Sequence, residues 1–258
     1  MELFYRKSGS GKPLVILHGL FGISDNWAAL ARRWSEHFTV YALDLRNHGQ
    51  SPHAEEWNYS VMAEDVIEFL GTERLHDIIL LGHSMGGKTA MRLALDFPQV
   101  LSKLIVSDIA PRYYELQQQH VIEALNAVPL DQISSRKEAE QILVQHLHDQ
   151  GTIQFLLKNL TWKDLPDGSK KLDWRFNFKV IRDHIDVVAE PTDSPAPCEV
   201  DTLFIRGARS HYITDEDIRQ IPAVFPNAQF LTIPDAGHWV HADQPEHMYQ
   251  AVMNFTSL

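Results

Sequence analysis

The strongest indication of the fold of this chain is the segment Ile78-Ile79-Leu80-Leu81-Gly82-His83-Ser84-Met85-Gly86. Its apolar start is as short and uniform as a strand that is buried on both faces of a parallel sheet. The residues that follow, 88–97, have the pattern of a helix that ends before Pro98. The stretch therefore predicts a sharp turn from a strand into a helix, with a serine at the turn.

The turn contains the pattern G-x-S-x-G, centred on Ser84. A serine in such a turn is held in a strained backbone conformation that exposes its oxygen, and Gly82 and Gly86 let neighbouring backbone approach closely. The helix that follows directs the positive end of its dipole towards this position. We interpret Ser84 as a nucleophile; the alternative is an ordinary glycine-rich turn in which Ser84 only caps the helix.

Short apolar runs and helical patterns alternate along most of the chain, which predicts βαβ units. The predicted strands are Leu14–Leu17, Phe38–Leu43, Ile78–Leu81, Leu104–Ser107, Thr202–Ile205 and Gln229–Ile233. The predicted helices are Asn26–Glu36, a segment capped by Ser60, Met85–Phe97 and Gln244–Phe255. The fold class is therefore α/β, with a mostly parallel central sheet flanked by helices.

The pattern changes between about positions 112 and 189, where no clear strand is visible. Helical segments are predicted at Gln117–Leu125, Lys137–Asp149 and Ile153–Leu160, and a proline-rich linker follows at 190–197. We expect residues 1–111 and 199–258 to form the core. Residues 112–198 would then be an inserted, all-helical lid with its linker.

The candidate base is His238, one of fourteen histidines. It follows the last predicted strand, in Ala236-Gly237-His238-Trp239, so it lies at the carboxyl end of that strand, as Ser84 does at its own. Carboxyl ends of parallel strands share one edge of a sheet, where binding sites assemble. His241 is the nearest rival, but it falls in or near the start of a helix.

The candidate acid is Asp108, at the end of the strand directly after the nucleophile helix. A right-handed crossover places that strand beside the Ser84 strand, so Asp108 reaches the same edge. Its role would be to orient the imidazole and stabilise the imidazolium. The alternatives are Asp215 and Asp217, which stand behind the probable helix cap Thr214, where acids are expected from the helix dipole alone.

Two backbone amides are candidates for an oxyanion hole, those of Leu20 and Met85. The loop His18-Gly19-Leu20-Phe21-Gly22 follows a central strand directly, and Met85 follows the nucleophile. We expect His18 to brace the loop rather than to take part in chemistry. The alternative is that the loop is a simple strand-to-helix turn.

Composition narrows the class of partner. The net charge of −11 opposes binding to nucleic acid and to anionic lipid. The only cysteine, Cys198, excludes an intrachain disulfide and, in a proline-rich linker, is a poor nucleophile. The N-terminus turns polar at once and no apolar run approaches the roughly 20 residues of a membrane span, so a cytoplasmic location is predicted. Neither a metal site nor a cofactor is predicted, and no oligomeric state.

At these residues the chain resembles the α/β-hydrolase superfamily and, within it, the YbfF-type bacterial esterases and their animal mitochondrial relatives. The matching stretches are His18-Gly19-Leu20-Phe21-Gly22 with Asn26-Trp27, Asp44-Leu45-Arg46-Asn47-His48-Gly49-Gln50-Ser51, Gly82-His83-Ser84-Met85-Gly86-Gly87-Lys88, Asp108-Ile109-Ala110-Pro111 and Gly237-His238-Trp239-Val240-His241-Ala242-Asp243. The resemblance implies an α/β-hydrolase fold and carboxylesterase activity, or thioesterase activity on acyl-coenzyme A. It also supports Asp108, because the resemblance implies an acid directly after the strand that follows the nucleophile. The loop at Ser210-His211 lacks the carboxylate that the wider superfamily usually has there, so the chain departs from the superfamily at that position.

A small-molecule ester or thioester is therefore the expected substrate. Phe21, Trp162 and Trp239 are the candidate pocket residues, although the aromatic residues of the insertion could equally form its own core. A cationic rim for a phosphate-bearing thioester could come from Arg46, Lys88, Arg112, Arg206 and Arg209, although solvated surface charge explains most of them. Two rival functions share the sequence: the same triad could hydrolyse C–C bonds or form peracids, or the chain could be a non-catalytic ligand-binding protein.

Overall fold

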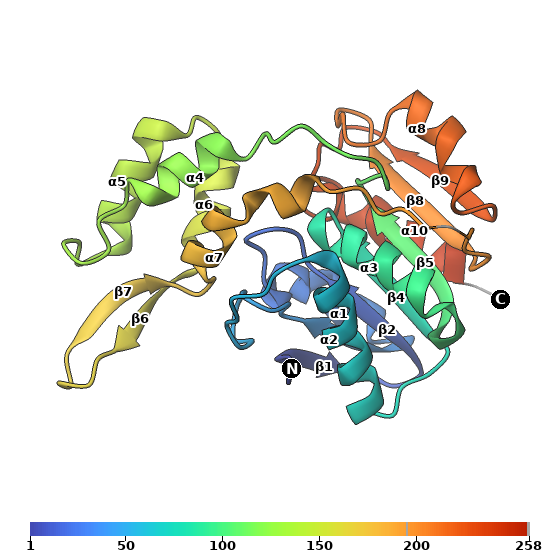
Figure 1. Cartoon of the computed structure of the whole chain (residues 1–258), viewed down its shortest axis with the longest axis horizontal. Helices are drawn as coiled ribbons and strands as arrows, with labels where there is room; N and C mark the ends of the chain where they lie inside the picture. Colours follow the sequence, from blue (N-terminus) through green and yellow to red (C-terminus); the bar gives the residue numbers. More distant parts are fainter. Residues whose placement is uncertain (195, 257–258) are drawn as a thin grey trace.

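A computed structural model of the chain describes residues 1–194 and 196–256. A twisted sheet with helices on both faces forms the core, and an insertion stands over one edge of that sheet (Figure 1). This is the layered α/β arrangement that the sequence predicts. Pro195 of the expected linker and positions 257–258 of the expected core lie outside the described residues.

The central sheet has seven strands in the order β1-β3-β2-β4-β5-β8-β9. All neighbouring pairs are parallel except β1 and β3, which are antiparallel. The strands are β1 (Tyr5–Ser8), β2 (Lys12–Leu17), β3 (Phe38–Leu43), β4 (Ile78–His83), β5 (Leu101–Ser107), β8 (Thr202–Gly207) and β9 (Ala228–Ile233). The six strands predicted as apolar runs are all present.

Side chains from each central strand pack into two separate layers. Leu14 and Ile16 of β2 belong to one hydrophobic cluster, and Val15 and Leu17 to the other. Because successive side chains of a strand point to opposite faces, a strand covered on both sides must be apolar at every position. That is why these strands appear in the sequence as unbroken apolar runs.

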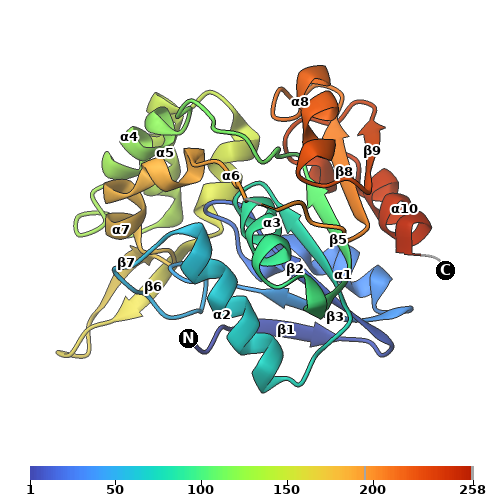
Figure 2. The ribbon, with the colours of Figure 1, turned by 45° about the vertical axis from the view of Figure 1, so that its right-hand side comes forward.

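Helices cover both faces of the sheet (Figure 2). α1 (Ala28–Trp34) and α10 (Pro245–Thr256) cover one face, and α2 (Tyr59–Thr72) and α3 (Met85–Asp96) cover the other. The remaining elements of the core are η1 (Ser24–Trp27), η2 (Pro98–Val100), α8 (Asp215–Gln220), η4 (Ile221–Ala223) and α9 (Val240–Asp243).

Two details of the core differ from the prediction. The edge strand β1 was not predicted, because its residues are largely exposed and include Arg6 and Lys7, so it contains no apolar run. Helix α2 is capped by Asn58 rather than by Ser60: the Asn58 side chain accepts a hydrogen bond from the Val61 amide at 2.9 Å. Both residue types cap helices well, so sequence alone does not choose between them.

The insertion leaves the core after β5 and returns before β8. Its helices are α4 (Gln119–Asn126), α5 (Arg136–His146), α6 (Gln150–Leu157), α7 (Phe178–Asp183) and η3 (Ile185–Ala189). It also contains an antiparallel hairpin of β6 (Leu160–Asp164) and β7 (Lys170–Trp174), which projects away from the core (Figure 1). The prediction of an all-helical insertion is thus wrong for this segment. The predicted limits of the insertion, 112–198, stay a prediction.

The helices of the described residues are all too short or too polar to cross a membrane.

Candidate active site

Three side chains meet at the carboxyl edge of the sheet. Ser84 follows β4, Asp108 follows the neighbouring β5, and His238 lies in the loop after β9. Ser84 and Asp108 both have a backbone φ of 53°, in the left-handed region that residues with a side chain rarely occupy. The sharp turn thus occurs at two adjacent strand ends, and it turns both side chains towards the site.

The three residues form one hydrogen-bonded chain. His238 Nδ1 lies 2.8 Å from Asp108 Oδ2, and His238 Nε2 lies 2.9 Å from Ser84 Oγ. With a neutral ring, Nδ1–H donates to the carboxylate, and Nε2 accepts the Ser84 hydroxyl proton. The structure therefore brings together the predicted nucleophile, base and acid in the geometry that proton transfer requires.

Close backbone packing around the turn requires glycine. A Cβ added to Gly82 would lie 2.2 Å from the carbonyl oxygen of Gly86, and one added to Gly86 would lie 2.5 Å from the carbonyl oxygen of His18. Both distances are too short for any side chain. The loop after β2 is thus held directly against the turn at Ser84, as the glycine pattern predicts.

Asp108 is fully buried, and both of its carboxylate oxygens are used. Oδ1 accepts the Gly207 amide hydrogen at 3.0 Å. Oδ2 accepts from the Ser210 hydroxyl as well as from His238. A buried carboxylate is tolerated only with such donors, which also fix its orientation.

The alternative candidates lie elsewhere. Asp215 pairs with Arg206 at 2.7 Å, and Asp217 accepts hydrogen bonds from Thr214 and pairs with Arg112 at 2.8 Å. Both acids thus lie in the first turn of α8, where the helix dipole alone explains them, and neither contacts His238. The Cys198 thiol is buried and burial raises its pKa, which disfavours the reactive thiolate.

Two buried histidines brace the site. His18 Nε2 accepts the Leu45 amide hydrogen at 3.0 Å, and its Nδ1 lies 2.8 Å from the carbonyl oxygen of Gly19. Nε2 of His83 lies 2.8 Å from the carbonyl oxygen of His238. Burial lowers the pKa of both rings, so both stay neutral and act as fixed hydrogen-bonding groups. The bracing role predicted for His18 is confirmed.

Three residues of the site were not singled out from the sequence. His83 and Ser210 hold the base loop and the acid, as described above. The third, Tyr212, stacks on the His238 ring with centroids 4.0 Å apart and an interplanar angle of 22°. Only the place of Ser210 and Tyr212 in the loop after a central strand hinted at them. His241 stands apart from the proton path and stacks on Trp27 at 4.2 Å.

A cavity of about 220 Å³ opens over Ser84, between the core and the insertion. Phe21 and Trp239 line it from the core, as predicted. From the insertion, Gln118 just before α4, Val121 of α4 and Phe155 of α6 also line the cavity. Most of the exposed wall area is apolar, as expected of a small-molecule site, although five imidazole and three amide side chains also line the cavity.

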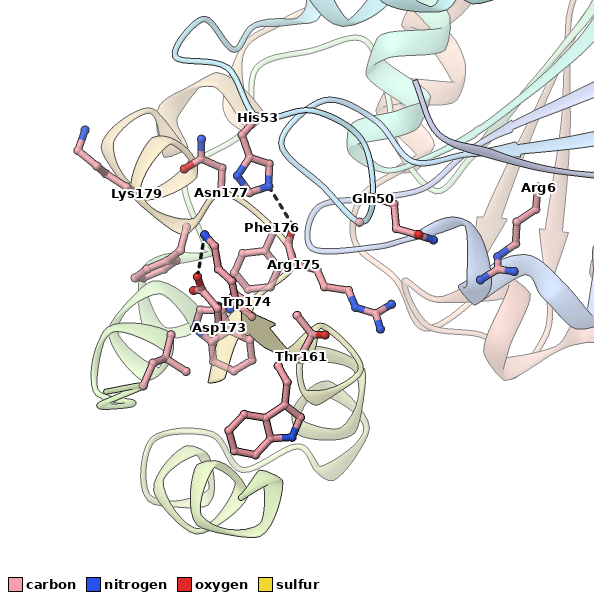
Figure 3. Close-up of a pocket in the computed structure, with 15 residues that line it drawn as sticks. Arg6, Gln50, His53, Thr161, Asp173, Trp174, Arg175, Phe176, Asn177 and Lys179 are labelled. Carbon is pink, nitrogen blue, oxygen red and sulfur yellow. Dashed lines mark hydrogen bonds and ion pairs between the residues drawn. The ribbon is translucent and has the colours of Figure 1, made fainter. Parts of the chain in front are cut away.

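Trp162 does not line this cavity, and its predicted place in the pocket is wrong. It is 51% exposed on β6 and borders a separate groove of about 760 Å³ between the hairpin and the loop after β3. Figure 3 shows this groove, where Nε2 of His53 lies 3.1 Å from the Arg175 carbonyl oxygen. Trp174 and Phe176 also border this groove. Their rings stack with centroids 5.4 Å apart and are buried, so they belong to the core of the insertion, as the alternative interpretation holds.

The predicted oxyanion donors lie beside the nucleophile. Leu20 and Met85 line, with Ser84, a small enclosed cavity of about 30 Å³. Met85 is the first residue of α3, so its amide hydrogen has no partner within the helix. The position is therefore suited to a developing negative charge, which the helix dipole also favours.

The five cations of the predicted rim are all engaged within the molecule. Arg46 forms a buried pair with Asp65 at 2.5 Å, and Lys88 donates to two backbone carbonyls. The remaining three arginines are engaged too: Arg112 pairs with Asp217, Arg206 pairs with Asp215, and Arg209 donates to the carbonyl oxygen of Asp235. The described residues contain no group of His, Cys, Asp and Glu side chains that could hold a metal ion.

The fold and the site together define the class of protein. A model of the alpha/beta hydrolase family matches residues 14–250. The chain therefore belongs to the alpha/beta hydrolase family.

Within that family the chain is similar to esterases. It is 36% identical to esterase YbfF of Escherichia coli, over 95% of this chain and 93% of that protein. It is also 36% identical to the sn-1-specific diacylglycerol lipase ABHD11 of Mus musculus, over 94% of this chain and 80% of that protein. A solved structure, a marine microorganism esterase, has a TM-score of 0.94 at 41% identity and covers 98% of this chain and 99% of its own. The predicted resemblance to YbfF-type esterases is confirmed.

Proposed function

We propose that the protein is a serine hydrolase that cleaves carboxylic esters through an acyl-enzyme on Ser84. The observation that carries the proposal is the chain of hydrogen bonds from Ser84 Oγ through His238 to Asp108, at 2.9 and 2.8 Å. The similarity to esterases and to a diacylglycerol lipase supports the same class of substrate.

The first half of the reaction forms the acyl-enzyme. Ser84 Oγ attacks the ester carbonyl carbon while His238 Nε2 takes the hydroxyl proton. The carbonyl oxygen becomes an oxyanion, for which the amides of Leu20 and Met85 are the donors. When the intermediate collapses, His238 gives its proton to the departing alkoxide, and the alcohol leaves.

The second half regenerates the enzyme. Water replaces the alcohol beside His238, which takes a proton from it as the water oxygen attacks the acyl carbon. Collapse returns the proton to Ser84 Oγ and releases the acid. Asp108 stabilises the imidazolium in both halves without taking a proton, and its donors Gly207 and Ser210 hold it in place.

The substrate should be small and apolar. The cavity over Ser84 has about 220 Å³, below the range of roughly 300–1,000 Å³ that is usual for drug-sized ligands. The five cations of the predicted rim are all engaged within the molecule, which favours simple esters over the phosphate-bearing acyl-coenzyme A. A panel of aryl esters from acetate to octanoate, run beside the matching acyl-coenzyme A thioesters, tests this part, and higher catalytic efficiency on the thioesters would contradict it.

A fluorophosphonate probe separates the three candidate functions. We expect it to label Ser84 of the folded protein and to block hydrolysis of p-nitrophenyl butyrate in the same proportion. Labelling without ester turnover would favour C–C bond hydrolysis or peracid formation by the same triad. A folded protein that is not labelled at Ser84 would favour a non-catalytic binding protein.

A further inference from the structure

Lys88 is a buried lysine that the reaction does not use. It lies one turn into the nucleophile helix α3, and its own amide donates to the carbonyl oxygen of Ser84 at 3.0 Å. Its side chain is fully buried, and no described carboxylate lies within ion-pair distance of Nζ. A buried ammonium is a costly way to fill space, since an apolar side chain of similar size would usually serve stability as well or better.

The partners of Lys88 are the two connections between the core and the insertion. Nζ donates to the carbonyl oxygen of Arg112, where the chain enters the insertion, at 2.6 Å. It also donates to the carbonyl oxygen of Glu190, where the chain returns. Figures 1 and 2 show these two connections crossing near α3.

The two connections are also bonded to each other. The Tyr114 amide donates to the carbonyl oxygen of Ala189 at 2.9 Å, and the Thr192 amide donates to that of Pro111 at 2.6 Å. Tyr114 also places its ring 5.0 Å from Lys88 Nζ. The entry and exit connections thus run antiparallel and are joined by two backbone hydrogen bonds, an arrangement that we call the clasp, and Lys88 reaches it from the nucleophile helix.

The clasp forms a wall of the space beside the nucleophile. Tyr114, Val188 and Ala189 line the small cavity that also contains Ser84. A shift of the clasp would therefore change the space open to an acyl or alcohol group at the reacting serine. Misplacement of about 1 Å can cost about 100-fold in rate, and one methylene in a hydrophobic pocket is worth about 10–200-fold in discrimination.

We propose that Lys88 is a positioning residue, which fixes both connections of the insertion to the nucleophile helix and thereby sets the chain-length preference of the site. The proposal rests on the proposed esterase function for its kinetic part. Its structural part, the fixing of the clasp, stands independently.

The test replaces the ammonium with an apolar side chain of similar length. For Lys88→Met we expect the ratio of kcat/KM for the p-nitrophenyl octanoate and acetate esters to change at least tenfold, with most of the change in KM. Hydrogen exchange at the Tyr114 and Thr192 amides should accelerate at least tenfold. Lys103→Met is the matched control. Lys103 lies near the amino end of β5, where it contacts Asp201 and Phe255, and it does not contact the clasp.

The outcomes are distinct. A lower melting temperature with an unchanged chain-length ratio and unchanged exchange at Tyr114 and Thr192 would make Lys88 merely structural and overturn the proposal. If exchange accelerates in Lys88→Met but neither this variant nor the unaltered protein hydrolyses any ester, the fixing of the clasp by Lys88 is supported and the proposed esterase function is wrong.

Exchange in the unaltered protein supplies a second test, for the case in which Lys88→Met does not fold. The Tyr114 and Thr192 amides should be protected as strongly as amides in α3. Exchange as fast as in the hairpin turn at Gly168 would contradict the proposal.

Discussion

The core and the insertion meet at the same cavity, but they contribute to it differently. The core supplies Ser84, Asp108 and His238 from strand ends, held by hydrogen bonds of 2.8 and 2.9 Å. The insertion supplies side chains such as Val121 and Phe155, which line the cavity without hydrogen bonds to the reacting groups. Chemistry thus lies at the strand ends of the sheet and substrate selection on the insertion and its attachment to the core. Variants of the triad should therefore change kcat, and variants of the insertion or of its attachment should change preference.

The largest effect should come from the nucleophile. Ser84→Ala removes the attacking oxygen, and we expect kcat for aryl esters to fall about 10⁵–10⁶-fold. The alanine keeps the backbone turn, so the melting temperature should stay unchanged. If Ser84→Ala keeps its activity within tenfold of that of the unaltered enzyme, Ser84 is not the nucleophile.

The acid should come next. Asp108→Asn leaves the shape but favours the wrong tautomer of His238, and a loss of about 10⁴-fold in kcat is expected, with little change in KM. Asp215→Asn is the control, because Asp215 pairs with Arg206 on the surface. If that control is as damaging as Asp108→Asn, the acid assignment is wrong.

A variant of the insertion should show the opposite pattern. Phe155 packs on Trp239 with ring centroids 5.1 Å apart and lines the cavity from α6. Phe155→Ala should change the preference between short and long acyl esters about 10–100-fold, mainly through KM. Val144→Ala, on the exposed side of α5, is the control. A fall in kcat alone, equal for all esters, would break the division between core and insertion.

The core should also lose stability in acid. Burial lowers the pKa of His48 to about 3, below its unfolded value of 6.5. Between these two pH values His48 is protonated in the unfolded chain and neutral in the native state. The free energy of unfolding therefore falls as the pH falls below 6.5, by about 1.4 kcal/mol per pH unit for this ring.

Urea titrations at pH 7.0 and 5.0 check the contribution of His48. His48→Asn keeps a donor near the carbonyl oxygen of Arg46 and should reduce the pH dependence of the unfolding free energy. His247→Asn, on an exposed position of α10, should leave it unchanged. An unchanged slope in the His48 variant would mean that this ring is protonated in the native state.

The smallest effect should come from a supporting donor in the core. Ser210 donates to the same Asp108 oxygen that accepts from His238. Removing one such hydrogen bond in Ser210→Ala should cost about 1.4 kcal/mol, a tenfold drop in kcat. Ser169→Ala at the hairpin turn is the control. A larger effect on KM than on kcat would contradict a role through Asp108.

The core was predictable because its signals are local. Strands covered on both faces must be apolar at each position, and the turn at Ser84 demands glycines at fixed spacing. The edge strand β1 was not predicted, because Arg6 and Lys7 are exposed and interrupt any apolar pattern. The hairpin was not predicted because its strands are short and partly polar. The alternation of buried and more exposed residues at Leu172, Asp173 and Trp174, after the turn at Gly168, was the available signal.

The rest of the site depends on contacts between distant segments. Ser210 reaches Asp108 only because β8 pairs with β5 in a particular register. Trp162 fails as a pocket residue because it lies on the hairpin, which projects away from the core, and composition does not reveal this. Lys88 looked like a surface cation in the sequence, and only the fold shows that both connections of the insertion pass over it.

Ser84 should carry the acyl group between the two halves of the reaction. Rapid acid quenching during turnover of p-nitrophenyl butyrate, followed by peptide mass spectrometry, measures this directly. We expect a butyryl adduct on the peptide that contains Ser84, and no adduct in Ser84→Ala. Full turnover with no acyl group on that peptide, or with the group on another residue, would contradict this role of Ser84.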